Sequence, residues 1–243
     1  MITAADFRPP RWLRNPHLQS VLGSSGLRQR RGLRALAGSG AVTLEHIVDG
    51  GDGVRLQGFH SQVSGRTSRG LVLLLHGWEG SADSSYMRLT AAQLLARGFD
   101  VFRLNFRDHG DTHHLNEDLF HSNRLDEVVH AALDVSRRFA GEVPMRVAGY
   151  SLGGNFALRL ALRAPQAGLA LAHVAAVCPL LDPATTMDSI ENGLPLYDWY
   201  FARKWRRSLE RKRSLFPQRH DFDDTVLALD IRALTDWLVQ RHT

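Results

Sequence analysis

The chain has 243 residues, of which 44% are hydrophobic and 23% charged, with a formal net charge of +5. This length fits one large α/β domain or two small ones. The single cysteine, Cys178, excludes an internal disulfide, favours a reducing compartment and is expected to be buried in its apolar run. Residues 1–15 contain no hydrophobic signal segment, and no run is long enough to cross a bilayer, so we expect a cytoplasmic protein without stable membrane insertion.

Almost all of the positive charge comes from arginine, because Lys204 and Lys212 are the only lysines. Nucleic-acid-binding surfaces carry clustered basic residues, whereas most of these arginines are scattered. We therefore expect no nucleic-acid partner. The weak alternative is DNA binding through the basic segment 203–213, which salt-dependent retention on DNA would test.

The first half of the chain alternates between predicted strands and helices. Residues 1–40 are expected to be irregular and to wrap the domain or cover its sheet. A hairpin is predicted next, with strands at 41–48 and 54–60 around the glycine-rich turn 50–53. The elements that follow are a strand at 71–75, a helix at 84–97, a strand at 99–106 and a helix capped at 123–126 that runs to about residue 139.

Two further predicted strands complete the alternation. They lie at 145–148 and 172–181, both expected to be buried, with a helix at 155–163 between them. Strand–helix alternation of this kind predicts a mostly parallel, doubly wound α/β sheet with helices on both faces.

Residues 149–154, Gly-Tyr-Ser-Leu-Gly-Gly, match the G-x-S-x-G pattern of a nucleophile elbow. The pattern follows a predicted strand and opens a predicted helix, which is the context the turn requires. The helix N-terminus behind Ser151 stabilises negative charge. We therefore predict that Ser151 is a catalytic nucleophile with a strained backbone and an exposed hydroxyl, supported by the close-approach glycines Gly149 and Gly153.

A second motif, His76-Gly77-Trp78-Glu79-Gly80, ends the strand at 71–75. A His-Gly turn at this point places one donor of an oxyanion hole. We predict that the backbone N–H groups of Trp78 and Leu152 are the two donors, each contributing about 3–4 kcal/mol to a developing oxyanion. His76 precedes the serine, so it is expected to support the turn and not to act as the catalytic base.

The chain after residue 183 is predicted to be helical, at 187–216 and 225–240. Phe201, Trp205 and Leu209 fall on one helical face. One interpretation is an amphipathic helix packed on the domain, with its basic face in solvent. The other is a lid over the active site that also meets lipid or anionic surfaces. The basic residues of this segment are Arg203, Lys204, Arg206, Arg207, Arg211, Lys212 and Arg213.

The whole set of motifs resembles the YheT-like branch of the α/β-hydrolases. The residues that carry the resemblance are 12–19 (Trp-Leu-Arg-Asn-Pro-His-Leu-Gln), 76–81, Tyr86, Met87, 105–107, Gly110 and 149–155. This resemblance implies a carboxylic-ester hydrolase with a Ser-His-Asp triad in which Ser151 is the nucleophile.

The resemblance also implies that a C-terminal part, with the last strands, the triad acid and the triad histidine, is absent from this chain. The histidines after Ser151 are His173, His220 and His242, and each is expected to be structural or at the surface. Asp182 follows the sixth strand and is expected to be a turn residue, although a few relatives of the fold keep their acid there. The chain is either a natural short protein or an incomplete gene model.

The segment 108–114 contains Asp108, His109, Asp111, His113 and His114. Such side chains can hold a divalent metal. Adjacent histidines do not form the helical pair of a metal site, however, so we expect no metal here and no cofactor elsewhere.

The sequence thus predicts a serine hydrolase of carboxylic esters that uses an acyl-enzyme and acts on a small-molecule ester, for which a lipid-like ester is one candidate. The alternative is a catalytically impaired remnant or a binding scaffold. In either case the strand around 174–177 would form an open sheet edge, through which the protein could associate with itself.

Overall fold

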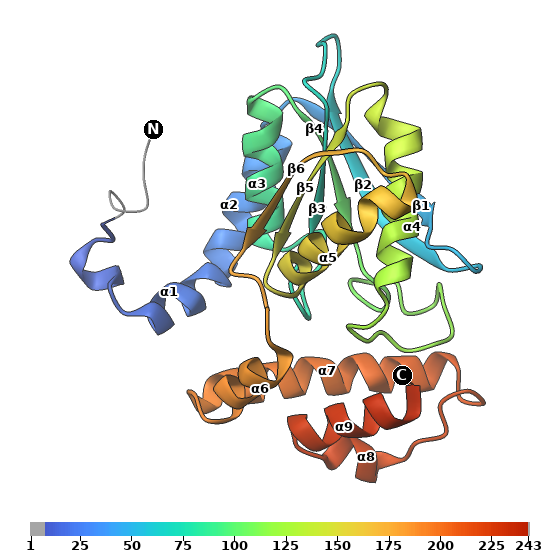
Figure 1. Cartoon of the computed structure of the whole chain (residues 1–243). Coiled ribbons are helices and arrows are strands. Elements are labelled where there is room, and N and C mark those ends of the chain that lie inside the picture. Colours follow the sequence, from blue (N-terminus) through green and yellow to red (C-terminus); the bar gives the residue numbers. More distant parts are fainter. Residues whose placement is uncertain (1–7, 243) are drawn as a thin grey trace.

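The computed structural model describes residues 8–242, which fold around one six-stranded sheet with the order β1-β2-β4-β3-β5-β6 (Figure 1). Strands β4, β3, β5 and β6 run parallel, whereas β1 and β2 are antiparallel to their neighbours. The predicted mostly parallel sheet is therefore confirmed. The strands are β1 (Ala41–Asp49), β2 (Arg55–Val63), β3 (Leu71–Leu75), β4 (Asp100–Leu104), β5 (Met145–Tyr150) and β6 (Leu171–Val177).

Helices cover both faces of this sheet. One face carries α4 (Leu125–Val135) and α5 (Leu152–Ala167), and the other carries α3 (Ser85–Ala96). The odd-numbered residues of β3 pack with α4 and α5, and its even-numbered residues pack with α3. Every residue of β3 is buried, as its continuous apolar run predicted.

The hairpin and the helix α3 also agree with the sequence, whereas α4 differs in detail. No side chain caps the start of α4, so the cap expected at 123–126 is wrong. The helix ends at Val135 and continues as a π-helical turn, Ser136–Ala140, which Gly141 closes with φ 62°. Its total extent matches the prediction.

The prediction that residues 1–40 are irregular is wrong for the part that the structure describes. It contains a short 3-10 helix, Arg11–Leu13, and the helices α1 (Pro16–Gly23) and α2 (Gly26–Ala37). Asn15 and Ser25 cap the two α-helices with their side-chain oxygens, and Pro16 occupies the first position of α1. These capping residues are the sequence signal that indicates two helices in this segment. Helix α2 packs along α3, whereas α1 has no buried residue, and residues 1–7 lie outside the described part.

Strand β6 and the residue after it are more exposed than predicted. Most β6 side chains are exposed or half-buried, and Cys178 is exposed with φ 46°. The reason is topological: among residues 8–242, β6 pairs only with β5 and forms the outer edge of the sheet. The apolar composition of the strand therefore predicted burial for side chains that are in fact exposed.

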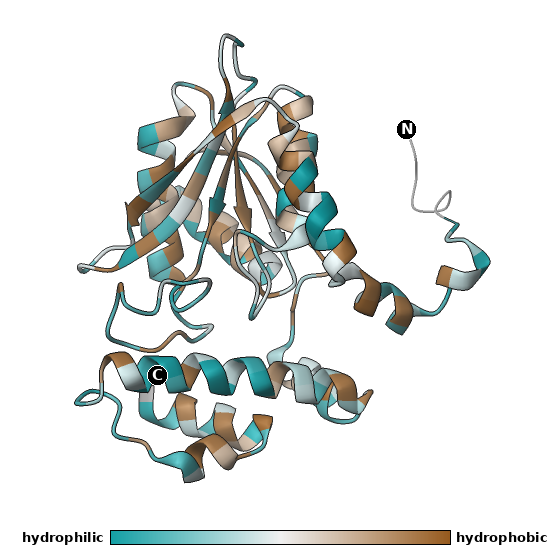
Figure 2. Cartoon of the chain, turned by 180° about the vertical axis from the view of Figure 1, so that it is seen from behind, coloured by the Kyte–Doolittle hydropathy of each residue, from teal (hydrophilic) through white to brown (hydrophobic). Residues whose placement is uncertain are grey.

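Four helices, α6 (Pro183–Glu191), α7 (Pro195–Leu215), α8 (Asp224–Ala228) and α9 (Ile231–His242), form a separate layer at one end of the strands (Figure 1). The predicted helix 187–216 is thus divided at residues 192–194. The layer has its own core, in which Trp205 and Leu209 pack with residues of α8 and α9. The hydropathy colouring shows long hydrophilic stretches on α7 (Figure 2), and within residues 8–242 no helix is long and apolar enough to span a membrane.

Candidate functional site

Ser151 lies in the turn between β5 and α5. Its φ of 52° and ψ of −118° are unusual for a residue with a Cβ, and the residue is exposed. Its N–H donates to the Val177 carbonyl at 3.0 Å, and its own carbonyl accepts from the Leu180 N–H at 3.2 Å. The strained strand–helix turn and the exposure predicted from sequence are therefore present, and the chain after β6 holds the turn in place.

Two glycines of the motif are required by close backbone contacts. A Cβ on Gly149 would lie 2.0 Å from the Gly153 carbonyl oxygen. A Cβ on Gly153 would lie 2.3 Å from the carbonyl oxygen of His76. Only glycine allows these backbones to approach so closely, and the second contact fixes the start of α5 against the end of β3.

The turn after β3 is held by buried side chains. The Nε2 of His76 accepts the Phe106 N–H at 3.2 Å, so its Nδ1 carries the proton donated to the Gly77 carbonyl at 2.7 Å. Burial holds the pKa of His76 well below its usual value, which keeps the ring neutral. Tyr86 accepts the Gly77 N–H at 3.0 Å. His76 therefore supports the turn, as expected, and both of its ring nitrogens are engaged.

This turn lies directly against Ser151. A Cβ on Gly77 would be 3.3 Å from the Ser151 Cβ. Among residues 8–242, no acceptor takes the Trp78 N–H, and the Leu152 N–H is the first of α5, where helices have no internal acceptor. The two backbone groups expected to bind an oxyanion thus flank the serine and remain available.

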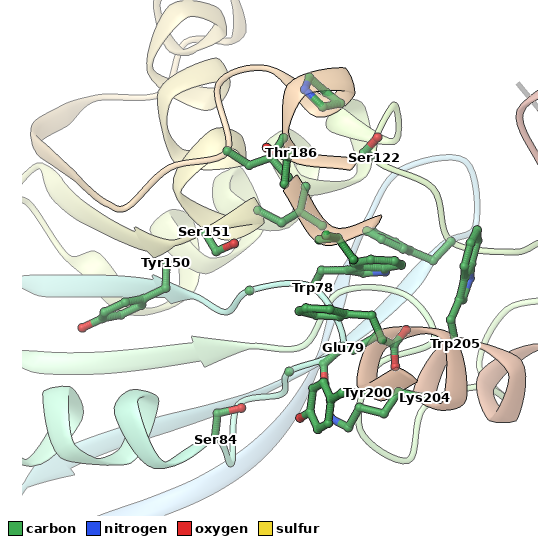
Figure 3. A pocket seen from close by; sticks show the side chains of 18 of the residues that line it. Trp78, Glu79, Ser84, Ser122, Tyr150, Ser151, Thr186, Tyr200, Lys204 and Trp205 are labelled. Carbon is green, nitrogen blue, oxygen red and sulfur yellow. The ribbon is translucent and has the colours of Figure 1, made fainter. Parts of the chain in front are cut away.

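Ser151, Trp78 and Leu152 all line one cavity of about 600 Å³ between the sheet and the C-terminal helices. Figure 3 shows Trp78 between Ser151 and the α7 residues Tyr200 and Lys204. The remaining wall is mainly apolar and comes from α2, α3, α6, α7, α9 and neighbouring loops, including the loop after β4. Its members include Phe120, Met187, Ile190, Phe201, Trp205, Leu238 and Val239.

Helix α7 is attached to the core by buried polar contacts, and Lys212 is the main correction to the predicted solvated basic face. Lys212 is fully buried and lies 2.6 Å from the Asp108 carboxylate. It also donates to the carbonyls of His113 and Asn116. The loop after β4 supplies all three acceptors, so the burial of this lysine could not be inferred from the periodicity of α7.

The loop 105–124 also supports the fold through the polar side chains of its histidines. His109 donates from Nδ1 to the Arg107 carbonyl at 2.7 Å and accepts the Glu79 N–H at 3.3 Å, and burial lowers its pKa to about 4. His113 lies 2.8 Å from the Ser208 hydroxyl of α7. Within the described residues, no group of three or more side chains is arranged to hold a metal.

Other candidate triad residues lie away from Ser151 or serve the fold. Asp182 caps α6 by accepting the N–H groups of Ala184 and Thr185, which agrees with the expected turn role. His173 lies in the first half of β6, and His220 is buried near the Glu117 carbonyl. The side chain of His242 lies outside the described part. His121, which sequence reasoning left without a role, is the histidine of the described residues that lines the cavity.

The sequence also gave no role to Glu79 and Lys204, which both line the cavity. Burial raises the pKa of the Glu79 carboxyl to about 7, although the nearby Lys204 lowers it. Glu79 has a φ of 54°, and its carbonyl accepts a hydrogen bond from Lys204 at 2.5 Å. The sequence signal for a role of Lys204 in the cavity is its helical spacing, which places it on the same face as Phe201 and Trp205.

Comparisons with known proteins agree on the fold. The sequence model described as the alpha/beta hydrolase fold matches residues 70–220. The esterase Pf2001 of Pyrococcus furiosus has a TM-score of 0.54 and 19% identity, over 71% of this chain and 65% of that one. The esterase Est22 has a TM-score of 0.50 and 20% identity, over 68% of this chain and 56% of the Est22 chain. The chain thus spans less than two thirds of either structure, and no curated protein sequence matches it.

Proposed function

Since the chain belongs to the alpha/beta hydrolase fold family, we propose that it derives from carboxylic-ester hydrolases and that Ser151 is its nucleophile. The observation that carries this proposal is the position of Ser151, in a strained turn that opens on the cavity beside two available backbone N–H groups. The motifs at 12–19 and 76–81 support the narrower proposal that the chain is a YheT-like member of the family.

In the proposed reaction, the Ser151 Oγ attacks the ester carbonyl, and the carbonyl oxygen becomes an oxyanion. The N–H groups of Trp78 and Leu152 stabilise that charge, and the dipole at the start of α5 adds to it. The alcohol leaves, and water then releases the acid from the acyl-enzyme. The chain's own backbone therefore supplies the electrostatic part of the reaction.

Proton transfer is the part for which the proposed site has no assigned residue. A serine hydroxyl is a weak nucleophile without a base, and loss of the triad histidine costs roughly 10⁶-fold in kcat. We therefore expect the 243-residue chain to be a poor esterase. The alternative, a catalytically impaired remnant or a binding scaffold, is favoured by the capping role of Asp182 and the buried position of His220.

The test is hydrolysis of p-nitrophenyl acetate together with labelling by a fluorophosphonate. We expect slow turnover that Ser151→Ala abolishes, while Ser122→Ala, a second serine on the cavity wall, leaves it unchanged. Turnover that survives Ser151→Ala would contradict the assignment of the nucleophile. Rapid turnover that is lost in His121→Gln would identify this cavity histidine as the base and contradict the expected impairment.

The remaining expectations are also proposals. Helices α6 and α7 border the cavity that contains Ser151, which supports a covering role for 187–216. The outer edge of β6, which pairs with no other strand of the described residues, supports self-association. A small-molecule ester as the partner, the absence of a nucleic-acid partner and a cytoplasmic location stay predictions of the sequence.

A further inference from the structure

Both lysines of the chain lie on α7, but their environments differ. Lys212 is fully buried and paired with a carboxylate at 2.6 Å. Lys204 is partly buried and lines the cavity. The difference indicates that Lys212 stabilises the fold. The role of Lys204 is then to be sought in the cavity that it lines.

Lys204 is held in place without being neutralised by an ion pair. Its ammonium donates to the Glu79 carbonyl at 2.5 Å and lies 5.2 Å from the centre of the Tyr200 ring. Among residues 8–242, no carboxylate oxygen lies within 4.0 Å of it. An ammonium group has three donors, so this contact leaves donors that a ligand can use.

The cavity around Lys204 is otherwise mostly apolar. The Trp78 ring stacks on the Phe201 ring, with 5.1 Å between the ring centres, and lies edge-on to the Trp205 ring, with 5.5 Å between the centres. Met187 and Ile190 of α6 extend this surface. A volume of about 600 Å³ suits a ligand of a dozen or more heavy atoms.

We infer that the cavity binds an anionic amphiphile, with its carboxylate or phosphate at Lys204 and its hydrocarbon part along Trp78, Phe201 and Met187. The inference rests on the proposed function, because it makes the substrate an ester that carries a separate anionic group. Ser151 lies on the other side of Trp78 from Lys204, so the anionic group and the reacting ester occupy different ends of the cavity (Figure 3).

Glu79 gives this site a dependence on pH. Its carboxyl lines the same cavity and faces Lys204 from α7, with Asp108 and His109 of the loop after β4 nearby. With a pKa of about 7, Glu79 is mostly neutral at pH 6 and mostly anionic at pH 8. A ligand anion is therefore bound more weakly at pH 8, because the ionised carboxylate repels it.

The experiment measures the binding of decanoate, decyl phosphate and the neutral decanol to the full chain by calorimetry. In Lys204→Met, which keeps most of the aliphatic stem, we expect both anions to bind about tenfold more weakly and decanol to bind as before. Lys204→Arg should retain most of the affinity. The matched control is Arg203→Met, the neighbouring residue, which stacks on Trp199 and does not line the cavity.

A second arm uses pH and Glu79. The wild-type affinity for decanoate should fall between pH 6 and pH 8, and Glu79→Gln should remove that fall. Because this arm does not use Lys204→Met, it tests the anion site even if that variant fails to fold. A decrease of the same size for decanoate and decanol in Lys204→Met, no change for either anion, or no binding of any probe would overturn the inference.

Binding is measured without turnover, so the two proposals fail separately. If decanoate binds through Lys204 but Ser151→Ala leaves turnover unchanged, only the assignment of the nucleophile fails. If Ser151 is required for turnover but the anions have no advantage over decanol, only the anion site fails.

Discussion

The sheet side of the cavity, residues 76–80 and 149–153, is fixed by backbone contacts, whereas the helical side is fixed by long side chains. On the sheet side, glycines bring backbones together and a buried histidine holds the turn. On the helical side, Lys212 and Lys204 reach from α7 to carbonyls and a carboxylate of distant loops. Both kinds of contact join distant parts of the chain, but those on the sheet side are close backbone approaches that glycine motifs allow, whereas those on the helical side need long lysine side chains.

The largest expected effect is on the helical side, in Lys212→Met. Removing the ammonium leaves Asp108 buried without its partner, so the free energy of unfolding should fall by about 3–5 kcal/mol. Urea denaturation measures the change. The matched control is Arg211→Met, which breaks the exposed pair with Asp111 and should cost at most about 1 kcal/mol.

The double variant Asp108→Asn with Lys212→Met sharpens this prediction, because it removes both buried charges. It should recover part of the stability lost in Lys212→Met. If the two single-residue variants at 211 and 212 lose equal stability, the helical side is not held by its buried ion pair, and the contrast with the sheet side is wrong.

The next effect is on the sheet side, in Gly153→Ala. The added Cβ would lie 2.3 Å from a backbone oxygen, which cannot move like a side chain, so we expect a loss of about 3 kcal/mol. In Gly26→Ala the added Cβ meets nothing within 4 Å, and the change should be below about 0.5 kcal/mol. Thermal unfolding of both variants measures the difference. Equal melting temperatures would contradict the close contact.

The smallest expected effect involves Glu79, where the two sides meet. Its pKa is raised from 4.5 to about 7 in the folded chain, so its contribution to stability is fully present below pH 4.5 and is lost as pH rises through 7. The difference between wild type and Glu79→Gln should therefore change by about 2–3 kcal/mol between pH 4.5 and pH 8. Urea denaturation at several pH values measures it. A constant difference would mean that Glu79 ionises normally.

Much of the sheet and its turns could be predicted from short stretches of sequence. The apolar run of β3, the glycine turn of the hairpin and the pattern around Ser151 each encode their structure locally, because sterics and chain reversal act over a few residues. The helices that Asn15 and Ser25 cap are encoded on the same local basis, by a capping side chain at the start of each helix.

Only the tertiary structure decided which side chains are buried and what they contact. Cys178 and β6 are exposed because no strand in the described part of the chain pairs with the outer edge of β6, although their composition is apolar. Lys212 is buried because the loop after β4 surrounds it, although its helical neighbours are charged. Glu79 and Lys204 meet in the cavity because α7 packs over the turn that follows β3. Burial and charge pairing depend on the whole set of neighbours in space, which local sequence patterns do not contain.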